Sequence, residues 1–91
     1  MTLEIIRPGS YVKREIKFFK KHPELINQYA KTLKLLSLDI KHPSLRLYAI
    51  KTKSCHFISI NMQYWVLLTL KLVNDGQVVL IDVGDHGLYA G

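Results

Sequence analysis

The sequence predicts an α+β fold: an N-terminal strand, then an antiparallel two-helix hairpin packed on one face of a four-stranded, mainly antiparallel sheet. Three observations support this prediction. Two segments with helical hydrophobic spacing follow one another almost without a break, four short apolar segments come after them, and turn residues separate those four. With 91 residues, 48% of them hydrophobic, the chain is expected to form a single domain over residues 1–91.

The first strand is expected over residues 3–6, because turn residues end this apolar segment at Arg7-Pro8-Gly9. Ser10 is then placed to cap a helix over residues 11–21. Glu15 falls on the apolar side of this helix, where a contact with a basic group elsewhere would account for it. The other side carries five cations, which form either a solvated surface or a site for an anionic partner: Lys13, Arg14, Lys17, Lys20 and Lys21.

The second helix is expected to begin at Pro23, because proline is favoured at the first helical position and ends the preceding helix. Apolar residues then recur at helical spacing as far as Ser37. Since almost nothing joins the two helices, they are expected to form an antiparallel hairpin. The side chains that should contact the sheet and form the core include Phe19, Leu33 and Leu36.

Four strands follow, and hairpin turns are expected between most of them. Along the third, alternation puts Tyr64 and Val66 on one face and Trp65 on the other, wetter face. His56 alternates onto an apolar face and is expected to be a hydrogen-bonded structural histidine rather than a catalyst. The four strands are expected over residues 45–50, 56–61, 64–73 and 77–83.

The end of the last strand is the first candidate site. Residues 78–83 are nearly free of polar side chains and predict a central strand buried on both faces. Gly84 allows the backbone to turn out of the sheet, and His86 and Tyr89 follow. Histidine transfers protons near pH 7, so this segment is either a simple polar terminus or part of an active site.

Charge and cysteine content limit the partners and the compartment. The formal net charge of +6 favours an anionic partner, either nucleic acid or an acidic protein segment, over a membrane surface. A single cysteine, Cys55, cannot form an internal disulfide, which predicts a reducing, cytoplasmic setting. The longest apolar stretch, residues 64–70, is far shorter than the roughly 18 residues needed to cross a bilayer, and no signal segment is recognised.

Five segments occur in a specific order and spacing: Phe19-x-x-His22-Pro23-Glu24-Leu25, Leu38-Asp39, His42-Pro43-Ser44-Leu45-Arg46-Leu47, Ile58-Ser59-Ile60-Asn61 and Leu80-Ile81-Asp82-Val83-Gly84-Asp85-His86. Together they resemble the RelE/ParE superfamily of bacterial and archaeal toxins, nearly end to end. The resemblance implies a toxin of a type II toxin-antitoxin system, with a cognate antitoxin as partner. The RelE branch cuts mRNA on the ribosome without a metal or cofactor, and the ParE branch poisons DNA gyrase.

The resemblance also assigns roles to residues. His86 would be the general acid or base, Arg46 or Lys51 would hold the phosphate, and Tyr89 would stack or donate a proton. RNA binding would fall to four residues, and antitoxin binding to the five cations of the first helix. The four RNA-binding residues are Lys51, Lys53, Trp65 and Lys71.

Five residues depart from the family pattern. Tyr48, Ala49 and Thr52 replace a His, a Lys and a Gly, Trp65 replaces an Arg, and Gly87 replaces an Asp. Trp65 stands where the family has an arginine, and an indole stacks on a base but does not replace two charge-assisted hydrogen bonds to a phosphate. Two functions therefore stay open. One is a ribosome-dependent mRNA endoribonuclease, and the other is a degenerate or ParE-like binding protein that acts through antitoxin or gyrase.

Overall fold

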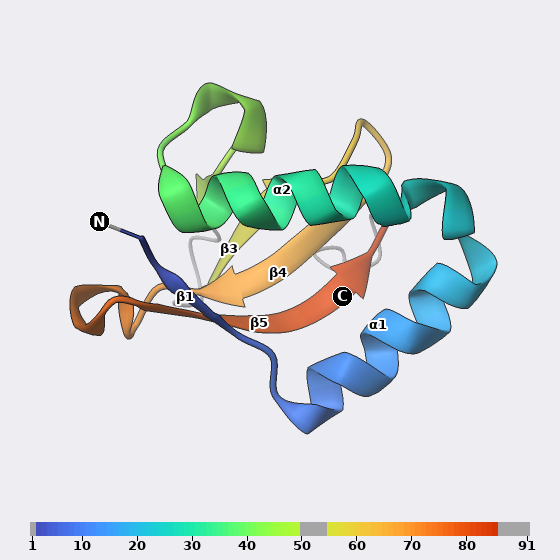
Figure 1. The fold of residues 1–91 in the computed structure, drawn as a ribbon, viewed down its shortest axis with the longest axis horizontal. Helices are drawn as coiled ribbons and strands as arrows, with labels where there is room; N and C mark the ends of the chain where they lie inside the picture. Colours follow the sequence, from blue (N-terminus) through green and yellow to red (C-terminus); the bar gives the residue numbers. More distant parts are fainter. Residues whose placement is uncertain (1, 50–54, 86–91) are drawn as a thin grey trace.

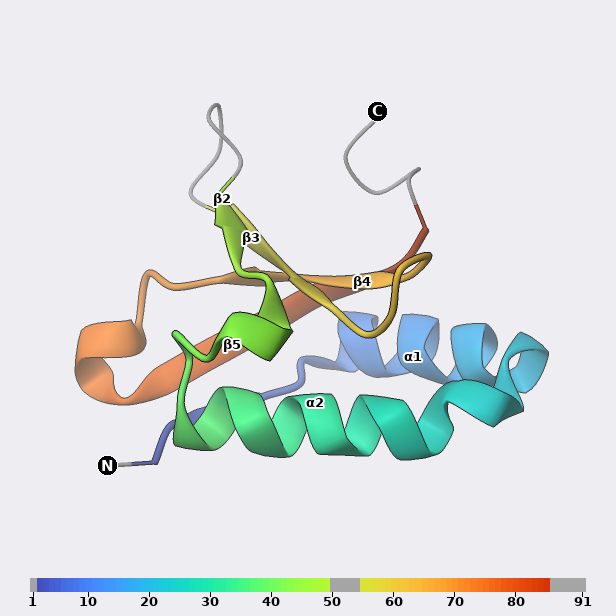
Figure 2. The same cartoon turned by 90° about the horizontal axis from the view of Figure 1, so that it is seen from above.

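Two helices cover one face of a mixed sheet, as Figures 1 and 2 show. The structure is a computed structural model that describes residues 2–49 and 55–85. Within these residues, three short 3-10 turns interrupt the connections, namely η1 (Pro23–Leu25), η2 (Pro43–Leu45) and η3 (Val73–Asp75). The helices and strands are β1 (Glu4–Ile6), α1 (Gly9–Lys21), α2 (Ile26–Leu38), β2 (Tyr48–Ala49), β3 (Cys55–Ser59), β4 (Trp65–Thr69) and β5 (Gln77–Gly84).

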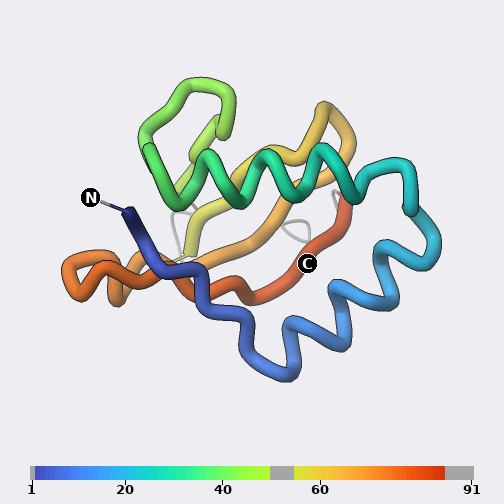
Figure 3. The backbone as a smooth tube through the Cα atoms, in the orientation of Figure 1, coloured from blue at the N-terminus to red at the C-terminus, as the bar shows by residue number. Residues whose placement is uncertain are grey.

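The described strands form one five-stranded sheet in the order β1-β5-β4-β3-β2. β1 pairs with β5 in parallel, and the other neighbours pair antiparallel. Figure 3 shows how the start of the chain comes to lie along β5. The predicted α+β architecture is confirmed, with one difference in detail. The N-terminal strand joins the sheet as an edge strand, so that the sheet has five strands rather than four.

The first helix begins earlier than expected, and the second begins as a 3-10 turn. α1 starts at Gly9, because the amide of Val12 donates to the carbonyl of Pro8 at 2.9 Å, so Ser10 lies inside the helix instead of capping it. The second helical segment does start at Pro23, but its first turn is the 3-10 turn η1. The two helices run in opposite directions and diverge (Figure 1).

Three of the predicted strands are shorter than the hydrophobic pattern indicates, and one of them, expected over 56–61, runs from Cys55 to Ser59. Of the described residues 45–49, only Tyr48–Ala49 form a strand (β2), because the turn η2 is followed by Arg46 in the left-handed region at φ 51°. The strand over 64–73 ends at Thr69, and the chain then turns through η3 and Gly76, whose φ of 78° suits a residue without a side chain. The long apolar runs therefore include turns as well as strands.

β5 is not buried on both faces, although it lies between two other strands. Its residues alternate, with Val78, Leu80 and Val83 buried and the residues between them half-buried. The reason is that the helices of the described residues lie on one face of the sheet (Figure 2). The pairing of β4 with β5 shifts between Leu67 and Leu68, an irregularity of the β-bulge kind.

The core lies between the helices and the sheet. The largest side chains that are fully buried there include Tyr11, Leu36, Leu45, Ile58, Leu68 and Leu80. Phe19 and Leu36 are core residues as predicted, whereas Leu33 only packs against the cluster and is half-buried.

Replacing Leu36 by alanine is expected to lower the free energy of unfolding by about 2–5 kcal/mol, because the side chain is fully buried and its removal leaves a cavity. Leu33→Ala removes the same atoms from a half-buried position and is expected to cost clearly less. Urea denaturation of both variants measures the difference. Equal losses would show that α2 buries a different face.

Glu15, which lies on the apolar side of α1, is buried and fully engaged. Arg7 donates a hydrogen bond to one carboxylate oxygen at 2.9 Å, and the Tyr29 hydroxyl donates to the other. The Tyr11 and Tyr29 hydroxyls lie 2.8 Å apart. The expectation that a basic group contacts Glu15 is thus confirmed. Buried polar groups need such partners, because an unpaired one costs free energy.

No helix in the part of the chain that the structure describes is long and apolar enough to cross a membrane.

Candidate functional site

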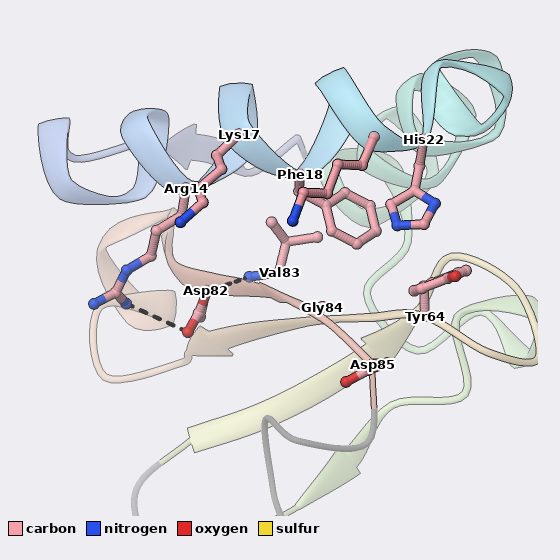
Figure 4. Close-up of a pocket in the computed structure, with 10 residues that line it drawn as sticks. Arg14, Lys17, Phe18, His22, Tyr64, Asp82, Val83, Gly84 and Asp85 are labelled. Carbon is pink, nitrogen blue, oxygen red and sulfur yellow. Dashed lines mark hydrogen bonds and ion pairs between the residues drawn. The ribbon is translucent and has the colours of Figure 1, made fainter.

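An open cleft of about 610 Å³ lies between α1 and the C-terminal end of β5 (Figure 4). Arg14 and Phe18 point into the cleft from α1, and His22 directly follows the last residue of that helix. Tyr64, which directly precedes β4, lies on the sheet side of the cleft. The full lining is Arg14, Lys17, Phe18, Lys21, His22, Tyr64, Asp82, Val83, Gly84 and Asp85. The cleft thus joins residues of α1 to strand residues more than 60 positions later in the chain.

The cations of α1 divide into two stripes. Arg14, Lys17 and Lys21, called here the inner stripe, line the cleft. Lys13 and Lys20, called the outer stripe, are exposed and do not line it. The division follows from helical geometry, since residues three, four and seven apart share a side of a helix. Three of the five cations predicted to bind an antitoxin therefore line the cleft, and two lie beside it; which partner they bind stays a prediction.

Within the inner stripe, Arg14 is already engaged by the protein. Its guanidinium lies 3.4 Å from Asp82 Oδ2 and donates to the carbonyl of Ile81 at 3.3 Å. The other Asp82 oxygen accepts a hydrogen bond from the amide of Val83 at 2.8 Å. Among the described residues, no ion pair engages Lys17 or Lys21. The cationic groups that the cleft offers to a ligand are therefore those of Lys17 and Lys21.

One wall of the cleft is aromatic. The rings of Phe18 and His22 have centroids 4.6 Å apart, and Tyr64 lies 5.3 Å from Phe18 and 4.8 Å from His22. His22 Nδ1 is also 3.6 Å from a carboxylate oxygen of Glu24. No role in a site was predicted for His22 from the sequence. The i, i+4 spacing of Phe18 and His22 is the signal that would have put both on one side of the helix.

Ammonium groups beside exposed ring edges are suited to nucleic acid, because cations bind the phosphates and aromatic rings stack on bases. The cleft combines both kinds of group within one turn of α1 and the start of β4. Of its two acidic residues, Asp82 is paired with Arg14, so that its charge is largely offset, and Asp85 is exposed at the rim.

Trp65 lies at the same end of the sheet as the cleft. It is paired with Gly84 across β4 and β5 and follows Tyr64 directly. Since successive strand residues point to opposite faces, Trp65 faces away from the helices, as predicted. His86 comes two residues after Gly84. His86, Tyr89, Lys51 and Lys53 lie outside the described residues.

Two other predicted residues are not brought to this end of the sheet by a strand. Arg46 is exposed and ends the turn η2, so it does not share a strand face with Tyr48, as a continuous strand over 45–50 would require. Lys71 lies beyond the far end of β4 from Trp65, a strand length of roughly 13 Å or more at about 3.3 Å per residue. Trp65 and Lys71 therefore do not contact one nucleotide together.

His56 is not hydrogen-bonded in the way the sequence suggested. Its Nδ1 atom is buried and has no hydrogen-bond partner among the described residues. The reason is its position, because its neighbours on the adjacent strands are Ala49 and Leu68, whose side chains are apolar.

No protein-family model matches the sequence, and no curated protein matches it significantly. Solved structures do match. YafQ in the E. coli DinJ-YafQ toxin-antitoxin complex aligns over 100% of both chains, with a TM-score of 0.75 and 16% identity. The YoeB dimer from Staphylococcus aureus covers 94% of this chain and 99% of its own, with a TM-score of 0.64 and 14% identity. HP0894 from Helicobacter pylori covers 93% and 96%, with a TM-score of 0.56 and 19% identity.

These similarities show the fold. The chain has the fold of RelE-like toxins of type II toxin-antitoxin systems, and the resemblance drawn from the sequence is confirmed at that level. YafQ has been solved in complex with DinJ, and YoeB in complex with YefM.

Proposed function

We propose that this chain, which has the RelE-like fold, is the toxin of a type II toxin-antitoxin system and cuts mRNA bound to the ribosome. The observation that supports this function best is the cleft at the end of β5, where Lys17 and Lys21 lie opposite Tyr64. The candidate catalyst His86 follows Asp85, the last lining residue, in sequence. The cleft would receive the phosphates of the RNA strand on one side of the reacting residue.

The reaction we propose is attack of a ribose 2′-OH on the adjacent phosphate. It needs a base for the 2′-OH, a positive group for the phosphate and an acid for the leaving 5′ oxygen. His86 would transfer protons, with Tyr89 as a second donor or stacking group. Lys51 would hold the scissile phosphate. Arg46 is the weaker candidate for that task, because it lies between the turn η2 and the first residue of β2 and so is not held by a strand.

Further contacts would position the RNA. Trp65, on the face of the sheet away from α1, would stack on one base of the RNA, and Lys17 and Lys21 would bind phosphates of the same strand where it passes through the cleft. Lys53 and Lys71 would bind the strand farther away.

A cognate antitoxin is part of this proposal. The complexes of YafQ with DinJ and of YoeB with YefM support it, since both are proteins of this fold bound to an antitoxin or partner chain. The net charge of +6 suits an acidic partner segment.

A binding protein of the same fold is the second candidate. The observation that favours it is Trp65, since the arginine expected there would stabilise charge on the phosphate. Such a protein would act through its antitoxin or, as in the ParE branch, through gyrase.

Trp65→Arg is expected to raise mRNA cleavage by about 10²–10³-fold, the range lost when one preorganised donor is removed from an active site. His86→Ala is expected to abolish the cleavage that the wild type shows. Primer extension on mRNA after induction of each variant gives the measurement. Strong wild-type cleavage that survives His86→Ala would contradict the assignment of His86.

The same cultures separate the two candidate functions. If Trp65→Arg produces no cleavage while induction still arrests growth, the binding-protein function is favoured. Loss of negative supercoiling in a reporter plasmid would then indicate gyrase as the target.

A further inference from the structure

β5 carries one extra residue where it pairs with β4. Leu67 is paired with Asp82, but the next residue of β4, Leu68, is paired with Leu80. Between these two pairs β5 therefore has one residue more than β4, namely Ile81, which is the arrangement of a β-bulge. A bulge bends its strand and changes the direction of the residues that follow it. This bulge lies close to the end of β5 that borders the cleft.

The side chain of Arg14 contacts this bulge from α1 (Figure 4). Its guanidinium donates to the carbonyl oxygen of Ile81 at 3.3 Å and lies 3.4 Å from Asp82 Oδ2. Asp82 Oδ1 in turn accepts a hydrogen bond from the amide of Val83 at 2.8 Å. One arginine is thus joined to the extra residue of the bulge and to the residue after it, and through that carboxylate to the next backbone amide. We call these contacts of Arg14, Ile81, Asp82 and Val83 the bulge clamp.

The bulge clamp lies immediately before the residue that we propose as the catalyst. Val83 is followed by Gly84 and Asp85, which line the cleft, and His86 comes next in the sequence. Gly84 has no side chain that could help to fix the direction of the backbone. It pairs with Trp65 in β4, and the bulge clamp adds a polar connection from this end of β5 to α1. The clamp therefore constrains the strand at the point where it leads to the candidate active site.

We propose that Arg14 is a positioning residue for mRNA cleavage, because the bulge clamp fixes the direction in which β5 continues toward His86. The inference rests on the proposed function. It divides the inner stripe by task, since Lys17 and Lys21 bind phosphate and Arg14 binds the protein's own strand. A displacement of about 1 Å at an active site can lower a rate by about 100-fold, whereas an ion pair between partly exposed groups contributes little to stability. The clamp therefore affects the reaction more than the fold.

Cleavage rates of the full-length chain on ribosomes programmed with mRNA, measured against ribosome concentration, test the proposal. Arg14→Gln and Asp82→Asn are each expected to lower the rate at saturating ribosomes by about 10–100-fold, while the half-saturating concentration changes by less than about twofold. The variant with both changes is expected to be no slower than either single variant, because both remove the same contact. Arg14→Lys is expected to restore part of the rate, since an ammonium group still pairs with Asp82.

Two matched changes leave the bulge clamp intact. Lys13→Gln removes one positive charge from the same helix, at an exposed residue that does not line the cleft. Asp75→Asn removes one negative charge from an exposed residue shortly before the other end of β5. Both variants are expected to cleave within about twofold of the wild-type rate, because salt screens charges that are far from the site.

The bulge clamp can also be observed without RNA. In heteronuclear NMR spectra of the free protein, Arg14→Gln is expected to shift the amide signals of Gly84, Asp85 and His86, which are far from Arg14 in the sequence. Lys13→Gln is expected to leave these signals in place. Thermal melts followed by circular dichroism are expected to match the wild type for every variant, because the side chains of the ion pair are partly exposed.

The outcomes separate this proposal from the proposed function. A lower half-saturating concentration in Asp82→Asn would overturn the positioning role, because it would show that Asp82 withholds Arg14 from RNA. Wild-type rates in both single variants, or unchanged amide signals in Arg14→Gln, would overturn it as well and leave the toxin function standing. If the wild type cuts no mRNA while the amide signals shift, the proposed function fails and the bulge clamp remains. Slower cleavage by both single variants at an unchanged half-saturating concentration supports the proposal.

Discussion

Above about pH 10, the free energy of unfolding is expected to fall by about 2.7 kcal/mol per pH unit, the value for two tyrosines that hold their protons only in the folded chain. Burial raises the pKa of Tyr11 far above its usual range, and the neighbouring Glu15 carboxylate adds to the effect. Burial also raises the pKa of Tyr29, and the hydrogen bond that its hydroxyl donates to the Glu15 carboxylate adds to the effect.

The sign follows from proton counting. Below pH 10 both states hold the phenolic protons, so the stabilisation is fully present. As the pH rises past 10, tyrosines of the unfolded chain lose their protons while Tyr11 and Tyr29 in the folded chain keep them, and the equilibrium shifts toward unfolding. A domain of marginal stability, about 5–15 kcal/mol, would unfold within a few pH units.

Absorbance at 295 nm and circular dichroism, followed together against pH, measure this effect. Of the five tyrosines, two are expected to ionise only as the helical signal is lost. Tyr29→Phe should halve the steepness, since one of the two groups is gone. Ionisation of all five tyrosines with a native circular dichroism spectrum would contradict the buried network of Tyr11, Tyr29 and Glu15.

Much of the fold could be predicted from the sequence, because hydrophobic periodicity reports local structure. The two helices, the β segments and the need of Glu15 for a basic partner were all predicted. The strand over 45–50 was not predicted correctly. Its apolar pattern continues through η2, and the left-handed backbone of Arg46 is a conformation that hydrophobicity does not reveal.

The candidate site was harder to predict, because it is made by contacts between distant segments. Arg14 meets Asp82, and Phe18 meets Tyr64, across the packing of α1 on the sheet. A helical projection shows cations on one side of α1 but not which strand end they approach. The five cations were therefore predicted to form one surface. In the structure the inner stripe lines the cleft and the outer stripe does not.

Reversing the two lysines of the cleft, as Lys17→Glu with Lys21→Glu, is expected to lower mRNA cleavage by about 10²–10⁴-fold. The physical reason is the loss of two charge-assisted hydrogen bonds to phosphate, each contributing about 1.5–3 kcal/mol, together with repulsion by the new carboxylates. Within the described residues neither lysine is engaged in an ion pair, so their contribution to the fold is small. The melting temperature should therefore change little.

Lys13→Glu with Lys20→Glu is the matched control. It changes the net charge by the same amount and alters the same helix, but on the side away from the cleft. Its effect on cleavage is expected to stay below about tenfold, since only long-range attraction of RNA is weakened.

The rate at which the purified protein cuts mRNA on programmed ribosomes tests the central claim most directly. Primer extension over a time course gives the rate for the wild type, the two double variants and Trp65→Arg. We predict cleavage that depends on ribosomes, rises in Trp65→Arg, and is lost in Lys17→Glu with Lys21→Glu but retained in Lys13→Glu with Lys20→Glu. Absence of cleavage by both the wild type and Trp65→Arg, or equal rates for the two double variants, would contradict the claim that the cleft at the end of β5 binds the RNA of an mRNA-cutting toxin.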